Sequence, residues 1–534
     1  MRKKILALIL AAAMAFSASG TVSFAEENTG KHVGVLKIGT TKAADSFNSM
    51  SEGGSYGVMN YNSFSTAPFV QRGTDGAIQP FIMTSWEISE DKTSLTATFA
   101  VDQGITWHDG TPLTMDDIIF TFQYLREVKQ SYYTSDITDV EQIDDQTLKL
   151  SFNGPKAYAA LNCMATYVYV YPKHIWENIE DPKAYTGEDA IIGCGPYKVT
   201  DIDEEAQLIT YEKAADTYLG REITVDKVQV RTYDGHEALV MALKTGEVDA
   251  MYDYSNSLDS SMKPSLTGVE GLDPGMSTNS GHFQLVFGFN ETPTNDLAFR
   301  QAAAKALDYT LLAAAIGGED GQIAGTGIVS PVVQGFNEEL PLNEQDTEAA
   351  QAILEEAGYM DTDGDGFREL PDGSAMEVLI TPQYNEARSA LYARIAEIII
   401  QNMGDIGVKA VLDEESVRNK DHCSEVRKSG TYQLYIGYTT PGVASFDSVF
   451  LYTSTCNLPE YTEKYEEFRI SGSQEEYNEN LKDLQQIAAD SVIAIALCWD
   501  NAYFPFRTDK IGGWVNAPAY GGINVETWYS LYEK

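Results

Sequence analysis

Residues 83–125, MTSWEISEDKTSLTATFAVDQGITWHDGTPLTMDDIIFTFQYL, constrain the fold more than any other stretch of this chain. Apolar and polar residues alternate in SLTATFAV, a period typical of a β-strand with one buried face. HDGTP is rich in turn-forming residues. Thr114 can then cap a helix, and Asp116 and Asp117 place negative charge in its first turn, where the helix dipole favours it. The stretch therefore predicts a strand, a turn and a helix in close succession.

The first 25 residues have the pattern of a secretory signal. Arg2, Lys3 and Lys4 precede an apolar run, and Ser23-Phe24-Ala25 forms a small-x-small site, so we expect cleavage after Ala25. The apolar run is too short to span a bilayer comfortably, and later uncharged runs are interrupted by polar residues, Gly or Pro. The sequence predicts an exported, soluble protein without direct membrane insertion. With 534 residues, 43% of them hydrophobic, it should contain more than one domain.

The net charge of -42 limits the classes of partner. Nucleic acid is disfavoured, because its phosphates would be repelled. An anionic membrane surface is disfavoured for the same reason. The acidic residues are spread along the chain, and we interpret the excess as a means of staying soluble outside the cell.

Cysteines, histidines and short motifs give no sign of a metal-dependent or catalytic centre. The five cysteines are no disulfide framework, although export would permit a bridge, with Cys423 and Cys456 as the first choice. No CxxC pair occurs, and the six histidines lack zinc spacing. No G-x-S-x-G nucleophile elbow between a predicted strand and helix, no H-E-x-x-H helix and no P-loop occurs. We therefore expect no enzyme, although two opposed carboxylates of a secreted glycosidase would not show in the sequence.

Further local patterns follow along the chain. Residues 191–199, IIGCGPYKV, predict a rigid glycine–proline bend that enters a strand. Two segments, 238–251 and 391–412, each predict a helix that stops at a glycine before a strand. Other predicted elements are strands at 33–40 and 492–499, a strand pair at 139–152 and a helix at 481–491.

The order of these patterns, together with Phe287-Gly288-Phe289-Asn290 and residues 298–308, resembles a known family. It is the extracellular solute-binding protein family 5 of ABC transporters, the oligopeptide- and dipeptide-binding proteins. The resemblance covers about residues 34–528. It implies an α/β fold of the two-lobed periplasmic-binding-protein type (type II, the large peptide-binder class with an extra domain), with a hinge on which the lobes close over a ligand.

The resemblance also implies a division of the chain. Residues 26–65, 190–285 and 500–534 would form the discontinuous core domain of lobe 1, residues 66–189 an inserted accessory domain, and residues 286–499 lobe 2. The hinge would lie near residues 280–290 and 498–506, and Arg300 and Asp308 would be structural anchors. The implied protein is a monomer that passes a small-molecule or peptide ligand to ABC transporter permease subunits and requires no cofactor.

Ligand contacts are implied in four short loops that are rich in aromatic, amide and hydroxyl side chains. They are Phe64, Ser65, Thr66, Tyr132, Tyr133, Gln383, Tyr384, Asn385, Tyr438, Thr439 and Thr440. Such residues suit a pocket that combines apolar surface with a few hydrogen-bonding groups. Each of them could equally be an ordinary packed or loop residue.

Two charged residues that peptide binders of this family use are missing at the corresponding positions. Thr439 stands where an aspartate commonly binds the ligand's amino group, and Pro382 stands near the place of an arginine that binds the carboxylate. A buried charged terminus without a partner is costly, so a free dipeptide is disfavoured. An oligopeptide with solvated ends is the main expectation. The alternatives are an oligosaccharide or other non-peptide solute, and a peptide sensor or chaperone without import.

Family members from Gram-positive bacteria usually carry a lipid-modified cysteine at the cleavage site, whereas the first cysteine here is Cys163. The resemblance therefore leaves two locations open. The protein is either periplasmic or released and held at the cell surface.

Residues 361–372, DTDGDGFRELPD, resemble a calcium-binding loop. The oxygen ligands would come from Asp361, Asp363, Asp365, Glu369 and Asp372 and from the carbonyl group of Phe367. The sixth position is glycine, as the sharp turn requires, but the last is aspartate rather than glutamate and follows a proline. The pattern fits either a structural calcium ion or a solvated acidic turn.

Overall fold

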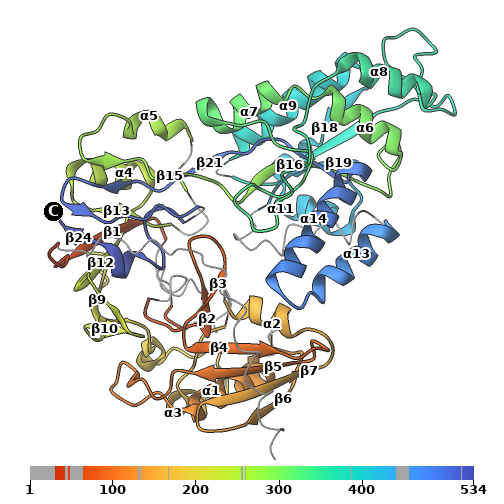
Figure 1. The fold of residues 1–534 in the computed structure, drawn as a ribbon. Coiled ribbons are helices and arrows are strands. Elements are labelled where there is room, and N and C mark those ends of the chain that lie inside the picture. Colours follow the sequence, from red (N-terminus) through yellow and green to blue (C-terminus); the bar gives the residue numbers. More distant parts are fainter. Residues whose placement is uncertain are drawn as a thin grey trace, which may run out of the picture.

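The structure is a computed structural model that describes residues 30–42, 46–48, 64–129, 134–165, 168–253, 257–258, 260–386, 388–439, 456, 458–518 and 520–534. The predicted signal segment and three predicted ligand residues, Tyr132, Tyr133 and Thr440, lie outside these ranges. The described chain forms three larger sheets with helices around them (Figure 1). None of its helices has the length and apolar character needed to cross a membrane.

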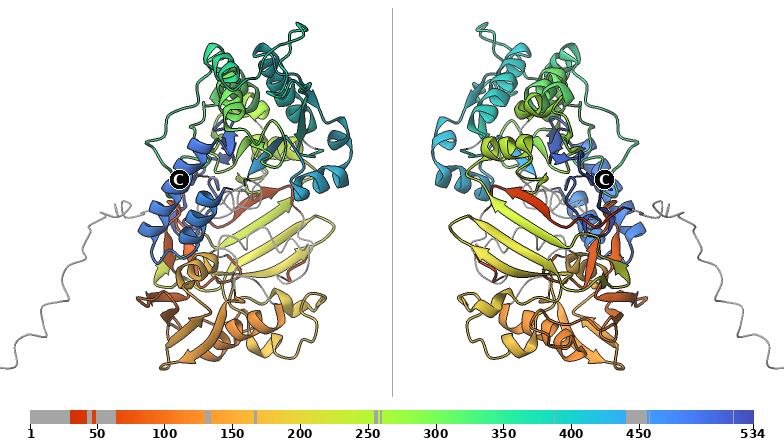
Figure 2. Two further views of the ribbon diagram at one scale, coloured as in Figure 1. Left: turned by 90° about the vertical axis from the view of Figure 1, so that its right-hand side faces the viewer. Right: turned by 90° about the vertical axis from the view of Figure 1, so that its left-hand side faces the viewer.

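The first body is built on a seven-stranded sheet with the order β14-β22-β13-β1-β12-β9-β8, which Figure 2 shows face-on. Its strands are β1 (Leu36–Thr40), β8 (Tyr197–Asp203), β9 (Leu208–Lys213), β12 (Lys227–Thr232), β13 (Ala250–Met251), β14 (Leu272–Asp273) and β22 (Phe506–Arg507). β1 is parallel to both β12 and β13, so the carboxyl ends of these three strands share one edge. Helix α4 (His236–Thr245) ends at Gly246, whose left-handed φ of 73° suits glycine.

The second body, at the bottom of Figure 1, is an antiparallel sheet with the order β4-β5-β7-β6. It comprises β4 (Met83–Ile88), β5 (Ser94–Phe99), β6 (Ile137–Gln142) and β7 (Thr147–Phe152), with α1 (Met115–Tyr124), α2 (Ala157–Met164) and α3 (Lys173–Trp176). The side chains of β5 alternate between buried and half-buried, as the sequence predicts. Thr114 is the N-cap of α1, and the Asp117 carboxylate accepts hydrogen bonds from its N–H group (2.9 Å) and its hydroxyl group (3.0 Å).

The third body is a five-stranded sheet with the order β18-β17-β19-β16-β20. Its strands are β16 (His282–Phe287), β17 (Val378–Pro382), β18 (Ala410–Leu412), β19 (Leu434–Thr439) and β20 (Ala494–Ala496). Its helices are α6 (Leu297–Ala306), α7 (Tyr309–Gly317), α8 (Thr347–Glu356), α9 (Ser389–Asp405), α10 (Glu414–Arg418), α11 (Lys420–Ser429), α13 (Pro459–Arg469) and α14 (Gln474–Ser491). β17 is parallel to β18 and β19, so their carboxyl ends also share one edge.

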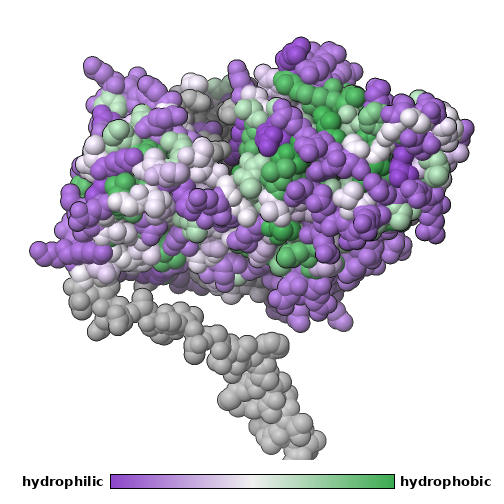
Figure 3. Space-filling model, turned by 90° about the horizontal axis from the view of Figure 1, so that it is seen from above, coloured by the Kyte–Doolittle hydropathy of each residue, from purple (hydrophilic) through white to green (hydrophobic). Residues whose placement is uncertain are grey.

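Shorter elements complete the described chain. They are β2 (Val70–Arg72), β3 (Ile78–Pro80), β10 (Thr217–Tyr218), β11 (Arg221–Glu222), β23 (Ile511–Gly512), β24 (Tyr532–Glu533), α5 (Lys263–Leu266), α15 (Thr527–Ser530), η2 (Leu125–Lys129), η3 (Glu188–Ile191), η4 (Ser260–Met262) and η5 (Gly318–Asp320). Seen from above, polar residues cover most of the surface, and the larger apolar patches lie over the right-hand lobe (Figure 3).

Two short strands form the crossing between the first and third bodies. β15 (Met276–Thr278) pairs antiparallel with β21 (Asn501–Tyr503). β15 leads into β16, and β20 leads into β21, so the chain passes between the bodies twice, side by side (Figure 1). β21 lies within the second predicted hinge segment, and β15 ends shortly before the first one.

Three features differ from the sequence analysis. Helix α14 begins at Gln474 rather than near residue 481, because the Ser473 hydroxyl caps it by accepting a hydrogen bond from the Glu476 N–H (3.1 Å). β20 is shorter than the predicted strand at residues 492–499. The predicted bridge between Cys423 and Cys456 is wrong, since both cysteines are free. The Cys423 sulfur instead accepts a hydrogen bond from the N–H group of Tyr384 (3.2 Å).

Candidate ligand-binding site

Two of the predicted ligand loops meet at the carboxyl edge of the third sheet. β17 ends at Pro382 and β19 ends at Thr439. The side-chain carbonyl of Gln383, directly after β17, accepts a hydrogen bond from the backbone N–H of Tyr438 (3.0 Å). In open α/β sheets, ligands bind outside the carboxyl ends of parallel strands. The fold thus brings Gln383 and Tyr438 together where such a site belongs.

A pocket of 330 Å³ opens beside Gln383, between the β17–α9 loop, the first turns of α9 and the end of α10. Its walls combine apolar, amide, hydroxyl and charged groups: Pro382, Gln383, Tyr384, Asn385, Glu386, Ser389, Tyr392, Ala393, Val417 and Arg418. The Asn385 side-chain oxygen accepts a hydrogen bond from the N–H of Arg388 at the start of α9 (3.0 Å). Of these, the three residues from Gln383 to Asn385 were predicted as ligand contacts. Pro382 ends β17, and the others join the pocket through the turn into α9 and through α10.

Tyr438 is held from three sides. Its hydroxyl accepts a hydrogen bond from the side-chain amide of Asn279 (2.8 Å). Its ring lies edge-on to Phe283 (4.9 Å between centroids), and the Arg388 guanidinium lies 5.0 Å from the ring centre. Burial, with a smaller effect from the Asp500 carboxylate, raises the pKa of the Tyr438 hydroxyl, which therefore stays neutral.

Thr439 is the last residue of β19 and pairs in register with His282, the first residue of β16. Thr439 is 4% exposed, and His282 is fully buried with its ring perpendicular to Trp499 (4.9 Å between centroids). Burial lowers the pKa of His282 to about 3, so the imidazole is neutral at physiological pH. These residues form a packed wall next to the crossing strands.

The predicted loop at Phe64, Ser65 and Thr66 lies in the core of lobe 1. The Phe64 ring is fully buried and stacks on Tyr197 at 4.3 Å. The Ser65 carbonyl accepts a hydrogen bond from the N–H of Gly195 (3.1 Å), and a Cβ at Gly193 would lie 2.0 Å from that carbonyl oxygen. The glycines of the 191–199 bend therefore let two backbone segments pass in contact. Thr66 is half-buried, and its hydroxyl has no hydrogen-bond partner in the described structure.

A buried carboxylate at the carboxyl edge of the first sheet was not predicted. Asp253 follows β13 and is fully buried. It accepts hydrogen bonds from the hydroxyls of Thr40 and Thr41 and from the N–H of Thr41 (2.7 Å). The His236 Nε2 lies 3.3 Å from the same carboxylate. An acid placed directly after a buried parallel strand was the signal that could have revealed it.

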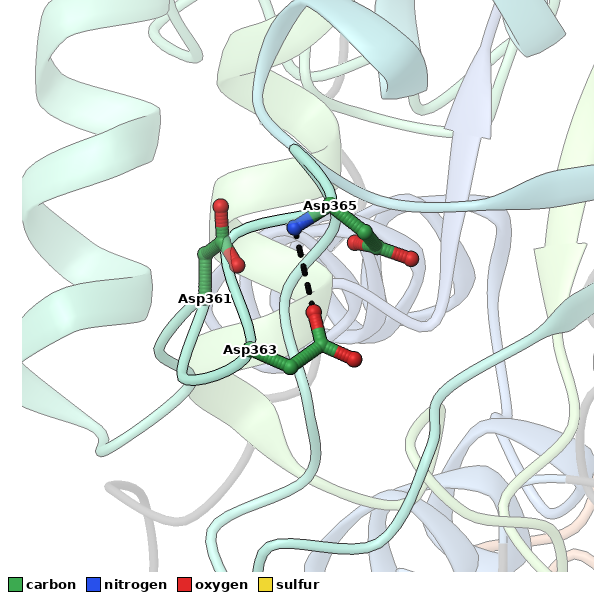
Figure 4. Close-up of side chains that lie close together, drawn as sticks. All are labelled: Asp361, Asp363 and Asp365. Carbon is green, nitrogen blue, oxygen red and sulfur yellow. Dashed lines mark hydrogen bonds between the residues drawn. The ribbon is translucent and has the colours of Figure 1, made fainter.

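The acidic loop brings three of its predicted ligands together (Figure 4). Asp361, Asp363 and Asp365 each offer a carboxylate oxygen, and these oxygens lie within 4.8 Å of one another. Gly366 has a φ of 94°, as the sharp turn at the sixth loop position requires.

The other side-chain ligands of that loop are engaged elsewhere. The Glu369 carboxylate accepts hydrogen bonds from the N–H (2.7 Å) and the hydroxyl (2.6 Å) of Thr362, and Asp372 accepts one from the N–H of Ser374 (2.9 Å). Phe367 donates its N–H to Asp365 (2.8 Å). The three aspartates fit part of a calcium shell, whereas Glu369 and Asp372 would have to turn to join it. The calcium prediction remains a prediction.

Two sheet-centred bodies joined by a pair of crossing strands, with an accessory sheet on the first, define a two-lobed α/β binding-protein fold. Residues 77–458 match the family of bacterial extracellular solute-binding proteins, family 5, middle region. The chain belongs to this family, which confirms the resemblance. The predicted fold class is confirmed as well.

Two relatives whose names give different ligands match the chain with similar sequence identity and coverage. The dipeptide-binding protein of Escherichia coli (strain K12) is 24% identical over 360 residues, which are 62% of this chain and 62% of that protein. Heme-binding protein A of Haemophilus influenzae is 23% identical over 383 residues, which are 67% of this chain and 65% of that protein. The chain thus spans a little under two thirds of these relatives. By their names they are solute-binding proteins and not enzymes, as the sequence predicts.

A solved structure shows the same fold over nearly the whole chain. It is the mannohexaose-bound periplasmic oligopeptide-binding protein of an oligopeptide ABC transporter from Thermotoga maritima, with a TM-score of 0.66. The two proteins are 19% identical, and the match covers 94% of this chain and 98% of the other.

Proposed function

We propose that this chain is an extracytoplasmic solute-binding protein that captures an oligopeptide between its two lobes and delivers it to an ABC importer. The observation that carries the proposal is the contact between Gln383 and Tyr438 at the carboxyl edge of the lobe 2 sheet. This contact lies near the crossing strands, because Tyr438 also binds Asn279, one residue after β15. A ligand held there could touch both lobes, and closure would follow from those shared contacts.

The composition of the pocket supports a ligand with many neutral polar groups. Gln383 and Asn385 can both donate and accept hydrogen bonds, as peptide groups require of a partner. Pro382, Ala393 and Val417 supply apolar surface. The charged groups in the wall are Glu386 and Arg418, and Arg418 pairs with Glu414 (2.8 Å). Such a lining suits a peptide backbone and its side chains, with the charged ends left in solvent.

Mass spectrometry of the material released from denatured protein tests the proposal. The protein is purified without refolding from cells grown in rich medium. The expected result is a ladder of mixed peptides whose total amount is equimolar to the protein. Their masses would also give the lengths of the bound peptides. A single non-peptide mass would overturn the oligopeptide assignment while leaving the fold unchanged.

An oligosaccharide or another non-peptide solute is the second candidate. It is favoured by the neutral amide and hydroxyl lining and by the mannohexaose that the Thermotoga maritima protein holds. Heme-binding protein A shows by its name that a relative takes a third kind of ligand. Isothermal titration with cello- and manno-oligosaccharides separates this candidate from peptides, because a peptide binder should release no heat with either sugar.

Delivery to an importer distinguishes this function from peptide sensing or chaperoning without import. The loaded protein should stimulate ATP hydrolysis by a transporter that carries matching permease subunits and is reconstituted in vesicles. Binding without stimulation by any such transporter of the source organism would favour a sensor or chaperone.

A further inference from the structure

The accessory domain of lobe 1 contacts lobe 2 at a place separate from the crossing strands. The turn between β4 and β5 and the start of α2 face the start of α14 (Figure 1). The Lys92 ammonium group lies 2.6 Å and 2.8 Å from the two carboxylate oxygens of Glu476. Beside this ion pair, the Tyr158 hydroxyl donates a hydrogen bond to the side-chain carbonyl of Gln474 (2.7 Å).

The backbone at Lys92 is held in an unusual conformation. Its φ is 59°, in the left-handed region that a residue with a Cβ rarely adopts. Its carbonyl accepts a hydrogen bond from the N–H of Ala157, which fixes the turn to the start of α2 (3.1 Å). Its side chain lies against Gly472, where a Cβ would come within 2.7 Å of the Lys92 Cε. Glycine would adopt this backbone conformation with less strain. We therefore infer that the lysine side chain matters for its contacts with lobe 2.

The start of α14 stabilises the charged form of the Glu476 side chain. It lies in the first turn of α14, where the helix dipole favours a carboxylate. The N–H of Gly472 donates a hydrogen bond to it (2.8 Å). Burial opposes its ionisation, but the hydrogen bonds from Lys92 and Gly472 and the charge of Lys92 together hold its pKa below the usual value. The Glu476 carboxylate is therefore charged at neutral pH.

The ion pair is partly open to water, whereas the Tyr158 ring is buried beside that of Tyr477 on α14 (6.0 Å between centroids). The side chains of Lys92 and Glu476 are 28% and 41% exposed. A neighbouring hydrogen bond, from the side-chain amide of Gln334 to the carbonyl of Asp75 (3.0 Å), also joins the lobes. An ion pair and a hydrogen bond as exposed as these two can part at small cost, because water replaces the lost partners.

We propose that Lys92, Tyr158, Gln474 and Glu476 form an interlobe latch that closes with the lobes and sets the closed fraction of the empty protein. The chain connects the lobes at β15 and β21, so a rotation about these strands would separate the latch residues. A ligand that prefers the closed state binds more tightly when more of the protein is already closed. The inference rests on the proposed function in taking ligand capture to involve closure.

Single-molecule energy transfer on the full, empty chain tests the latch. One dye is placed on α8 and one on the turn between β8 and β9, and bound material is removed by unfolding and refolding. The variants are K92E, E476K and the charge swap K92E/E476K. Each single reversal should raise the open-to-closed ratio about fivefold or more, since it replaces attraction by repulsion at a partly exposed site. The swap should restore the wild-type ratio.

A second ion pair provides the matched control. Lys227 and Glu212 lie 2.9 Å apart within lobe 1 and are 37% and 44% exposed. K227E should leave the ratio unchanged. Added salt should open the wild-type protein and have little effect on K92M/E476Q, because salt screens exposed charges.

Unchanged ratios in both single reversals, or a swap that stays as open as they are, would overturn the latch. These outcomes are read on empty protein, so they are distinct from a failure to find a bound peptide, which concerns the proposed function. A well-folded K92E protein with normal melting and a raised open fraction would support the latch against a purely structural role.

Discussion

The side-chain amide of Asn279 donates a hydrogen bond to the hydroxyl of Tyr438 at 2.8 Å, and so ties the crossing into lobe 2 to a predicted ligand residue. Asn279 follows β15 directly, and Tyr438 lies at the end of β19. If the crossing strands move, this hydrogen bond couples their movement to the aromatic ring at the edge of the site.

Tyr438→Phe should weaken ligand binding about fivefold, because one neutral hydrogen bond contributes about 1 kcal/mol. The ring and its contact with Phe283 are kept, but the amide of Asn279 loses its acceptor. Titration calorimetry with a peptide identified in the wild-type eluate measures the change. Tyr309→Phe is the matched control, since its hydroxyl bonds to the carbonyl of Ala304 within lobe 2 (2.6 Å) and should affect stability alone. Equal affinity in both variants would contradict the role of Tyr438.

Acid should destabilise the protein partly through His282. Burial lowers its pKa from 6.5 to about 3, so between these values the unfolded chain binds a proton that the folded chain does not. Stability should therefore fall as the pH falls from about 6.5 toward 3, with a slope of about one proton from this residue.

His282→Phe keeps an aromatic ring against Trp499 and removes the titrating group. The free energy of unfolding, measured with urea at several pH values, should depend less on pH in this variant. His108 keeps its own contribution in both proteins, because burial lowers its pKa to about 4. An unchanged pH dependence would show that His282 already binds a proton in the folded state.

Local patterns predicted much of the fold. The alternation of apolar and polar residues at 94–101 predicted β5, and the N-capping residue Thr114 predicted the start of α1. Both features depend on residues that are close together in the sequence. The start of α14 was missed although Ser473 and Glu476 carry a capping signal of the same kind.

The site was predicted less completely because it depends on distant contacts. The residues after β17 were found, and the structure places them at a pocket. Val417 and Arg418 join that pocket through α10, and no local pattern shows this. Phe64, an aromatic residue in a loop, was predicted as a ligand contact. In the structure its ring packs on Tyr197 in the core.

Gly193→Ala should destabilise the protein by about 2 kcal/mol or more, as expected for overpacking against a fixed backbone. The added Cβ would lie 2.0 Å from the carbonyl oxygen of Ser65, so the two segments would have to separate. Gly404→Ala is the control, because no atom lies within 4 Å of its added Cβ and alanine favours the helix α9. Chemical denaturation of both variants measures the difference. A tolerated Gly193→Ala would mean that the two segments can move apart freely.

Calcium should raise the melting temperature if the acidic loop takes the ion as the sequence predicts. Asp361, Asp363 and Asp365 repel one another at their present spacing, and a divalent cation would relieve this repulsion. Thermal unfolding with calcium and with a chelator measures the shift, and Asp363→Asn should abolish most of it. Asp203→Asn, at the exposed end of β8 in lobe 1, should leave the shift intact. If the melting temperature does not respond to calcium at millimolar concentration, the hydrogen bonds from the N–H groups of Gly364 and Thr362 to the carboxylates of Asp361 and Glu369 suffice to hold the loop, and it is a solvated acidic turn.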